Sequence, residues 1–80
     1  MNKFTKSKLA QYDGKEGRRA LVAYKGLVYD VTESMLWPQG VHWAMHDAGK
    51  DLTEELSHAP HGAKILESFP VIGVYSPEEE

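Results

Sequence analysis

All four histidines of this 80-residue chain lie within residues 37–61, and this clustering constrains the fold more than any other feature. His42 and His46 are four positions apart, a spacing that places two side chains on one face of a helix. His58 and His61 follow after a glycine and a second short helical pattern. Two histidine-bearing segments joined by a turn can face each other, so the stretch predicts a site that holds a bound group between them.

The length and composition of the chain limit what that group can be. A chain this short builds a small core and often needs a bound group or a cross-link for stability. It has no cysteine, which excludes disulfides, thiolate zinc sites, iron–sulfur clusters and covalently attached haem. The net charge of −3 disfavours a nucleic-acid partner. No apolar run approaches the roughly 20 residues of a membrane span, and the start of the chain does not resemble a secretory signal.

These limits predict one cytoplasmic domain over residues 1–80, with its core at about 4–75 and a polar tail at 76–80. The pattern of its first half predicts a short helix over residues 6–12, with Thr5 as the N-cap. Arg19–Tyr24 and Leu27–Val31 then form two β-like runs around a two-residue turn that contains glycine. This arrangement is typical of a β-hairpin, which we interpret as scaffold.

Short helices are predicted in the second half of the chain. The first covers Val41–Asp47 and ends at Gly49, a residue suited to a C-terminal cap. The second begins at Asp51, which we expect to cap it, with Glu54 three positions later as in a capping box. A further helix follows Pro60 and leads into the last strand.

That last strand is predicted over Phe69–Tyr75, with Gly73 marking a bulge or a close approach of two backbones. A few short strands, together with two helical hairpins grouped in the second half of the chain, indicate an α+β fold.

Imidazole is a common ligand of transition metals and of haem iron, so two chemistries compete for the histidines. His42 and His46 could chelate zinc, with His58 or His61 completing the site. The first histidine is not followed by the glutamate of a zinc protease motif, so zinc hydrolysis is not expected. The alternative is one histidine from each segment on opposite faces of a haem. No nucleophile with a base partner is apparent, and we do not expect an enzyme.

A haem slot also needs an apolar lining, and large apolar side chains flank the histidines. For these residues, packing in the core of a small domain and lining of a slot are compatible roles. The candidates for the lining are Leu36, Trp37, Trp43, Met45, Leu52, Leu56, Ile65, Leu66 and Phe69.

Several short motifs together resemble the cytochrome b5 haem-binding family, and the small free-standing prokaryotic members above all. The resemblance covers nearly the whole chain, from about Phe4 to Tyr75. It implies a small fold in which a short mixed sheet and two helical hairpins enclose a haem slot. The motifs are Y-D-V-T at 29–32, W-P-Q-G at 37–40, A-G-K-D-L-T at 48–53, A-P-H at 59–61 and P-V-I-G at 70–73.

The resemblance assigns the second axial ligand to His61, which follows Asp51 by ten residues as in the family. The first ligand of the family lies in an H-P-G-G loop, where this chain has Trp37 in place of the histidine. The membrane-associated progesterone-receptor group, which has a related fold, carries a tyrosine ligand in a G-x-Y motif. Because Gly40 stands two residues before His42, the resemblance favours His42 as the first ligand over His46.

The resemblance therefore implies non-covalent haem b with two axial histidines and a role in electron transfer. The acidic residues Asp47, Asp51, Glu54 and Glu55 flank the slot and are suited to a basic redox partner. Two other hypotheses remain: a ligand-binding module without redox turnover, similar to the progesterone-receptor group, and a histidine-rich zinc site.

Overall fold

The structure is a computed structural model that describes residues 2–32, 41–42, 46–58 and 60–79. Its centre is a four-stranded mixed sheet in the order β1-β6-β3-β2. β1 pairs in parallel with β6, and the other two pairs are antiparallel. The strands are β1 (Asn2–Phe4), β2 (Leu21–Tyr24), β3 (Leu27–Asp30) and β6 (Val71–Tyr75). The predicted α+β class with a short mixed sheet is confirmed.

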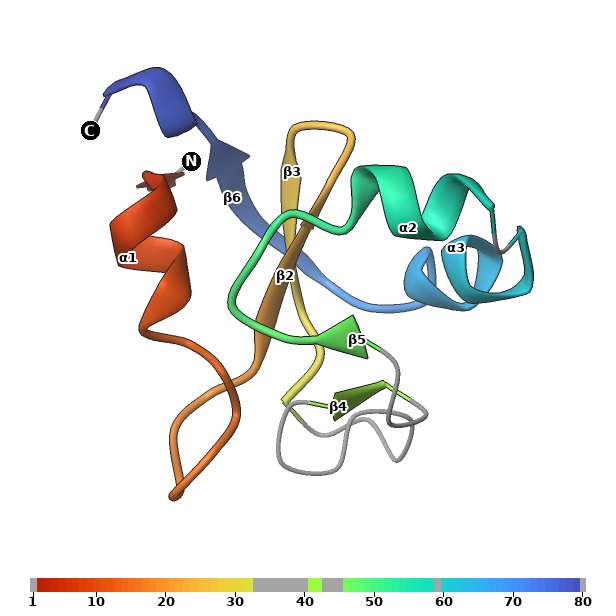
Figure 1. The fold of residues 1–80 in the computed structure, drawn as a ribbon, viewed down its shortest axis with the longest axis horizontal. Coiled ribbons are helices and arrows are strands. Elements are labelled where there is room, and N and C mark those ends of the chain that lie inside the picture. Colours follow the sequence, from red (N-terminus) through yellow and green to blue (C-terminus); the bar gives the residue numbers. More distant parts are fainter. Residues whose placement is uncertain (1, 33–40, 43–45, 59, 80) are drawn as a thin grey trace.

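Helices cover both faces of this sheet (Figure 1). On one side lies α1 (Lys6–Ala10), and on the other lie α2 (Thr53–Ser57) and α3 (Pro60–Leu66), which contact each other. The 3-10 turn η2 (Pro77–Glu79) ends the described chain. No helix in the described ranges has the length and apolar character needed to cross a membrane.

The sheet separates two apolar clusters because successive residues of a strand point to opposite faces. One cluster lies beneath α1 and contains Phe4, Leu9, Leu21, Ala23 and Val28. The other lies beneath α2 and α3 and contains Ala20, Val22, Tyr29, Val31, Ala48, Leu52, Leu56 and Leu66. Both faces of β2 are therefore buried, which explains why its sequence is continuously apolar rather than alternating.

The predicted hairpin is confirmed, with Lys25 and Gly26 as its two-residue turn. Their φ angles of 50° and 82° belong to the left-handed region that such turns need. Lysine takes this region at a cost, and bonds from outside the hairpin hold the turn. The Tyr75 amide donates to the Gly26 carbonyl at 2.9 Å, and the Lys25 amide donates to the Thr53 hydroxyl at 2.8 Å.

The outer edge of β2 is closed by the segment 49–52, which runs beside it before α2 begins (Figure 1). The Gly49 amide donates to the Leu21 carbonyl at 2.7 Å. The Ala23 amide donates to the Lys50 carbonyl at 3.1 Å, and the Ala23 carbonyl accepts from the Leu52 amide at 2.7 Å. The segment therefore pairs with β2 through one isolated parallel bridge and leads the chain to α2.

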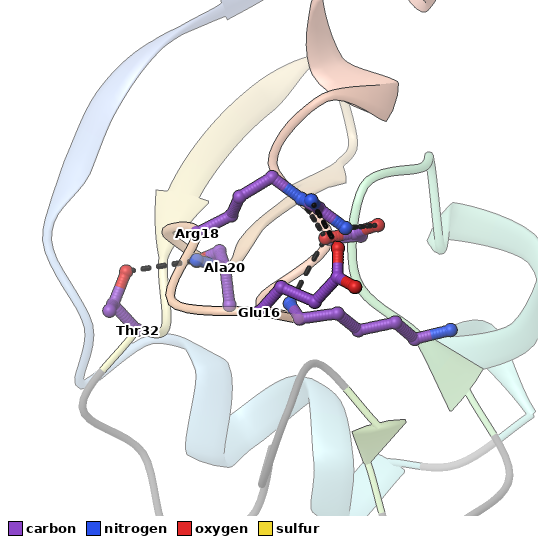
Figure 2. Close-up of polar contacts among 6 residues, drawn as sticks. Glu16, Arg18, Ala20 and Thr32 are labelled. Atoms are coloured by element: carbon purple, nitrogen blue, oxygen red, sulfur yellow. Dashed lines mark hydrogen bonds and ion pairs between the residues drawn. The ribbon is translucent and has the colours of Figure 1, made fainter.

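Polar contacts hold the loop between α1 and β2 (Figure 2). Arg18 donates to both carboxylate oxygens of Asp13, at 2.8 and 3.0 Å, and to Glu16 at 3.0 Å. The hydrogen bonds from the Arg18 side chain and the Lys15 amide lower the pKa of Asp13 to about 2. The loop is thus closed by charge-assisted bonds rather than by apolar packing.

The prediction of a helix over Val41–Asp47 is wrong. The structure has two short antiparallel strands instead, β4 (Val41–His42) and β5 (His46–Asp47), with His42 opposite His46. A helix of seven residues is unstable unless its neighbours support it, and Val, Trp and His are poor helix formers. Of the two predicted helical hairpins, the described residues contain only the α2–α3 pair. Gly49 still has a positive φ of 88°, but in the connection after β5.

Other local predictions are confirmed, with small shifts. Thr5 caps α1 by accepting from the Lys8 amide at 3.2 Å. Gly73 is a point of close approach beside an irregularity in the pairing of β3 with β6. The cap of α2 is one residue later than predicted, at Leu52, and Asp51 accepts from the Thr53 amide at 3.0 Å. The sequence patterns did not predict β1.

We predict that Gly73→Ala destabilises the protein by about 1–3 kcal/mol, because an added methyl group overpacks a filled site. A Cβ at this position would lie 2.5 Å from the Asn2 carbonyl oxygen and 2.6 Å from the Phe4 ring. Amide exchange should therefore accelerate in β1. Gly17→Ala is the control, because its Cβ would meet nothing within 4 Å and only its positive φ opposes alanine. Unchanged β1 exchange in Gly73→Ala would contradict the prediction.

Candidate functional site

The four histidines lie at four different places in the structure. His61 belongs to α3, whereas His42 and His46 lie opposite each other on β4 and β5. His58 caps the C-terminus of α2 and is exposed. The side chains of the other three histidines are outside the described part of the structure, so their assignment as ligands stays a prediction.

Four of the predicted lining residues belong to one place in the fold. Leu52 at the cap of α2, Leu56 of α2 and Leu66 of α3 are buried in the cluster beneath these helices, and Phe69 packs against it half-buried. The three leucines contact protein atoms on all sides, so they form the floor beneath α2 and α3. Ala63 of α3 also borders this cluster and is partly exposed. Leu36, Trp37, Trp43 and Met45 are outside the described residues.

The start of α2 is held by polar contacts within the A-G-K-D-L-T motif. A single carboxylate oxygen of Asp51 accepts from the Thr53 amide at 3.0 Å and from the Thr53 hydroxyl at 2.6 Å. The same hydroxyl accepts from the Lys25 amide of the hairpin turn. The motif therefore links the sheet to the helix pair that carries His61.

The Y-D-V-T motif forms a second polar cluster, where β3 ends and the chain leaves toward residue 33. Asp30 accepts from the Thr32 amide at 3.0 Å and from the Thr32 hydroxyl at 2.5 Å, and it pairs with Arg19. The Thr32 hydroxyl oxygen in turn accepts from the Ala20 amide at 3.0 Å (Figure 2). These contacts pin the end of the hairpin below the apolar cluster.

The pKa of Asp30 reflects this environment. Partial burial acts to raise it, but the two hydrogen bonds from Thr32 and the ion pair with Arg19 together hold the pKa below its ordinary value of 3.8. Asp30 is therefore charged at neutral pH and stabilises the fold in that form. Our sequence interpretation missed the Arg19–Asp30 pair, although the register of a two-residue hairpin turn brings these positions near each other.

The described part of the chain supplies an apolar surrounding of the kind that a haem needs. The helix α3, which carries His61, borders an apolar cluster that α2, α3 and the sheet build together. Among the side chains that the structure describes, no three His, Cys, Asp or Glu residues come together as a metal site. The described side chains do not include those of His42, His46 and His61.

Comparison with known proteins agrees with this arrangement. Residues 5–76 match the family described as "Cytochrome b5-like Heme/Steroid binding domain". A cytochrome b5 domain protein from Hadesarchaea is 56% identical, with a TM-score of 0.89 over 95% of this chain and 100% of that one. A cytochrome b5 domain protein from Methanococcoides burtonii is 53% identical, with a TM-score of 0.89 over 95% and 99%.

A more distant likeness extends to a plant protein. A hypothetical protein from Arabidopsis thaliana, described as having a cytochrome b5 like fold, is 24% identical, with a TM-score of 0.69 over 94% of this chain and 91% of that one. This likeness shows the fold alone. No curated protein sequence matches the chain.

We predict that Asp30→Asn lowers the free energy of unfolding by about 1–2 kcal/mol at pH 7, because bonds to a charged acceptor are lost. The folded state lowers the pKa of Asp30, so its charge stabilises the fold above pH 3.8 and this contribution is lost as the pH falls further. The free energies of unfolding of the wild type and the variant, measured with urea, should therefore converge as the pH falls below 3.8. A gap that is the same at both pH values would contradict this account.

Proposed function

Since the chain belongs to the cytochrome b5-like haem- and steroid-binding domain family, we propose that it binds haem b non-covalently and transfers electrons. The observation that carries this proposal is the position of His61 on α3, beside an apolar cluster shared by α2, α3 and the sheet. Domains of this family are generally binding modules rather than enzymes. The absence of cysteine requires that any haem is held without a covalent bond.

We assign the axial ligands to His61 and to His42, with His46 as the alternative to His42. The family motif supports His61, and the G-x-H sequence from Gly40 supports His42. The pairing of β4 with β5 gives His42 and His46 neighbouring backbone positions, so either could serve. A haem held by His61 and one of these histidines would supply one-electron redox chemistry and would have no open iron position for dioxygen. Outer-sphere electron transfer is the function that suits such ligation.

The chain contributes an apolar surrounding and a charged exterior to this chemistry. Leu52, Leu56 and Leu66 exclude water from the floor of the site, and burial of this kind tunes a haem potential. Glu54 and Glu55 lie in the first turn of α2, where Glu54 is exposed. We propose that this acidic helix guides a basic redox protein to the site, with an on-rate that falls as salt is added.

We predict that the purified protein takes up added haemin and, on reduction with dithionite, shows a sharp Soret band with resolved α and β bands. His61→Ala should remove this low-spin spectrum, because one of two strong axial ligands is lost. His42→Ala should do the same, whereas His46→Ala should not. His58→Ala is the matched control, since this histidine is exposed on the same helix pair and should leave the spectrum unchanged.

The outcomes separate the three hypotheses. If His46→Ala removes the low-spin spectrum and His42→Ala does not, the first ligand is His46. A broad high-spin spectrum in the wild type would favour the ligand-binding module without redox turnover. Failure to take up haemin would reject the proposal, and stoichiometric zinc would then identify the third hypothesis.

A further inference from the structure

The A-G-K-D-L-T motif contains one side-chain contact that the proposed function leaves unexplained. The Thr53 hydroxyl accepts a hydrogen bond of 2.8 Å from the amide of Lys25, which lies 28 positions earlier in the turn between β2 and β3. It donates its own proton to Asp51 at 2.6 Å. One hydroxyl therefore ties the tip of the hairpin to the first residue of α2.

The helix that begins at Thr53 depends on such contacts. α2 has only five residues, and a helix of this length is not stable alone. Backbone bonds hold the preceding segment along β2, and Leu52 and Leu56 hold the apolar side of the helix. Among the hydrogen bonds of the described residues, the Lys25–Thr53 contact alone joins the hairpin to α2 through a side chain.

The position of α2 is transmitted to α3. Residues 58 and 59 alone separate the two helices, and the helices contact each other. Leu56 of α2 and Leu66 of α3 are buried in the same cluster. A shift at the start of α2 therefore moves α3, and with it the backbone of His61.

We propose that Thr53 is a positioning residue, whose hydroxyl sets where α3 holds His61 relative to the sheet. This inference rests on the proposed function for the role of His61 and adds a residue that does not touch the cofactor. Thr53 is partly exposed, so water can replace the lost bond to Lys25 at little cost to global stability. Loss of the Thr53 hydroxyl should therefore change amide exchange in α3 and the retention of haem. It should change the free energy of unfolding of the whole protein only slightly.

We predict that Thr53→Val, which keeps the shape but removes the hydroxyl, accelerates haem transfer to excess apomyoglobin roughly fivefold, as expected for one lost hydrogen bond. It should also shift the g-values of the ferric low-spin protein, which report the orientation of the axial imidazoles. In the haem-free chain, amide exchange in α3 should accelerate. Thr53→Ser should restore all three properties, because it keeps the hydroxyl.

Ser57→Ala is the matched control. Ser57 is at the other end of α2 and its hydroxyl donates to the Glu54 carbonyl at 2.6 Å, within the helix. This variant loses a hydroxyl from α2 without losing the link to the hairpin. It should match the wild type in haem retention and in α3 exchange.

The inference is overturned if Thr53→Val behaves like Ser57→Ala in haem transfer, g-values and α3 exchange, even if its unfolding midpoint falls. Failure of the proposed function has a different signature, because the wild type would then take up no haemin. Exchange in the haem-free chain would still test the link between Thr53 and α3 in that case. Unchanged α3 exchange there would reject the link itself.

Discussion

The pairing of residues 49–52 with the outer edge of β2 is the contact on which both halves of the molecule depend. Without it, β2 would be an exposed edge strand with unpaired amides and carbonyls, an arrangement that proteins avoid. With it, the Leu21 carbonyl and both backbone groups of Ala23 bond to a segment that has no strand pattern of its own. The same bonds determine where α2 begins. The contacts that cover the edge of β2 therefore also position the helices.

The sheet consequently divides the fold into halves that differ in how they are held. On the α1 side, Phe4 and Leu9 pack against strands that are near them in the chain or paired with them. On the other side, Leu56 and Leu66 come from two helices of five and seven residues, and Leu52 caps the first of them. Helices this short need tertiary support. This half therefore relies on its apolar cluster and on the hydrogen bond between the Lys25 amide and the Thr53 hydroxyl.

Elements held by residues that are close together in the sequence were predicted, whereas elements held by distant residues were not. The turn at Lys25 and Gly26 is specified by neighbouring residues, and so is the cap at Thr5; both are confirmed. β1 was not predicted, because it pairs in parallel with β6 near the other end of the chain. No pattern within the residues of β1 indicates this distant pairing. The segment 41–47 was predicted wrongly because the i, i+4 spacing of His42 and His46 also suits two strands joined by a short turn, with the histidines opposite each other.

The sequence predicted the family to which the candidate site belongs, but not the side-chain contacts that hold the site together. The motif that ends at Thr53 pointed to the family, which residues 5–76 bear out, but it was interpreted as a helix cap alone. The structure shows what the residues of this motif do. Asp51 accepts a hydrogen bond from the Thr53 hydroxyl, and the hydroxyl oxygen accepts a hydrogen bond from the Lys25 amide. A serine would keep both bonds and a valine neither. The motif therefore needs a hydroxyl because a second element, 28 positions away, bonds to it.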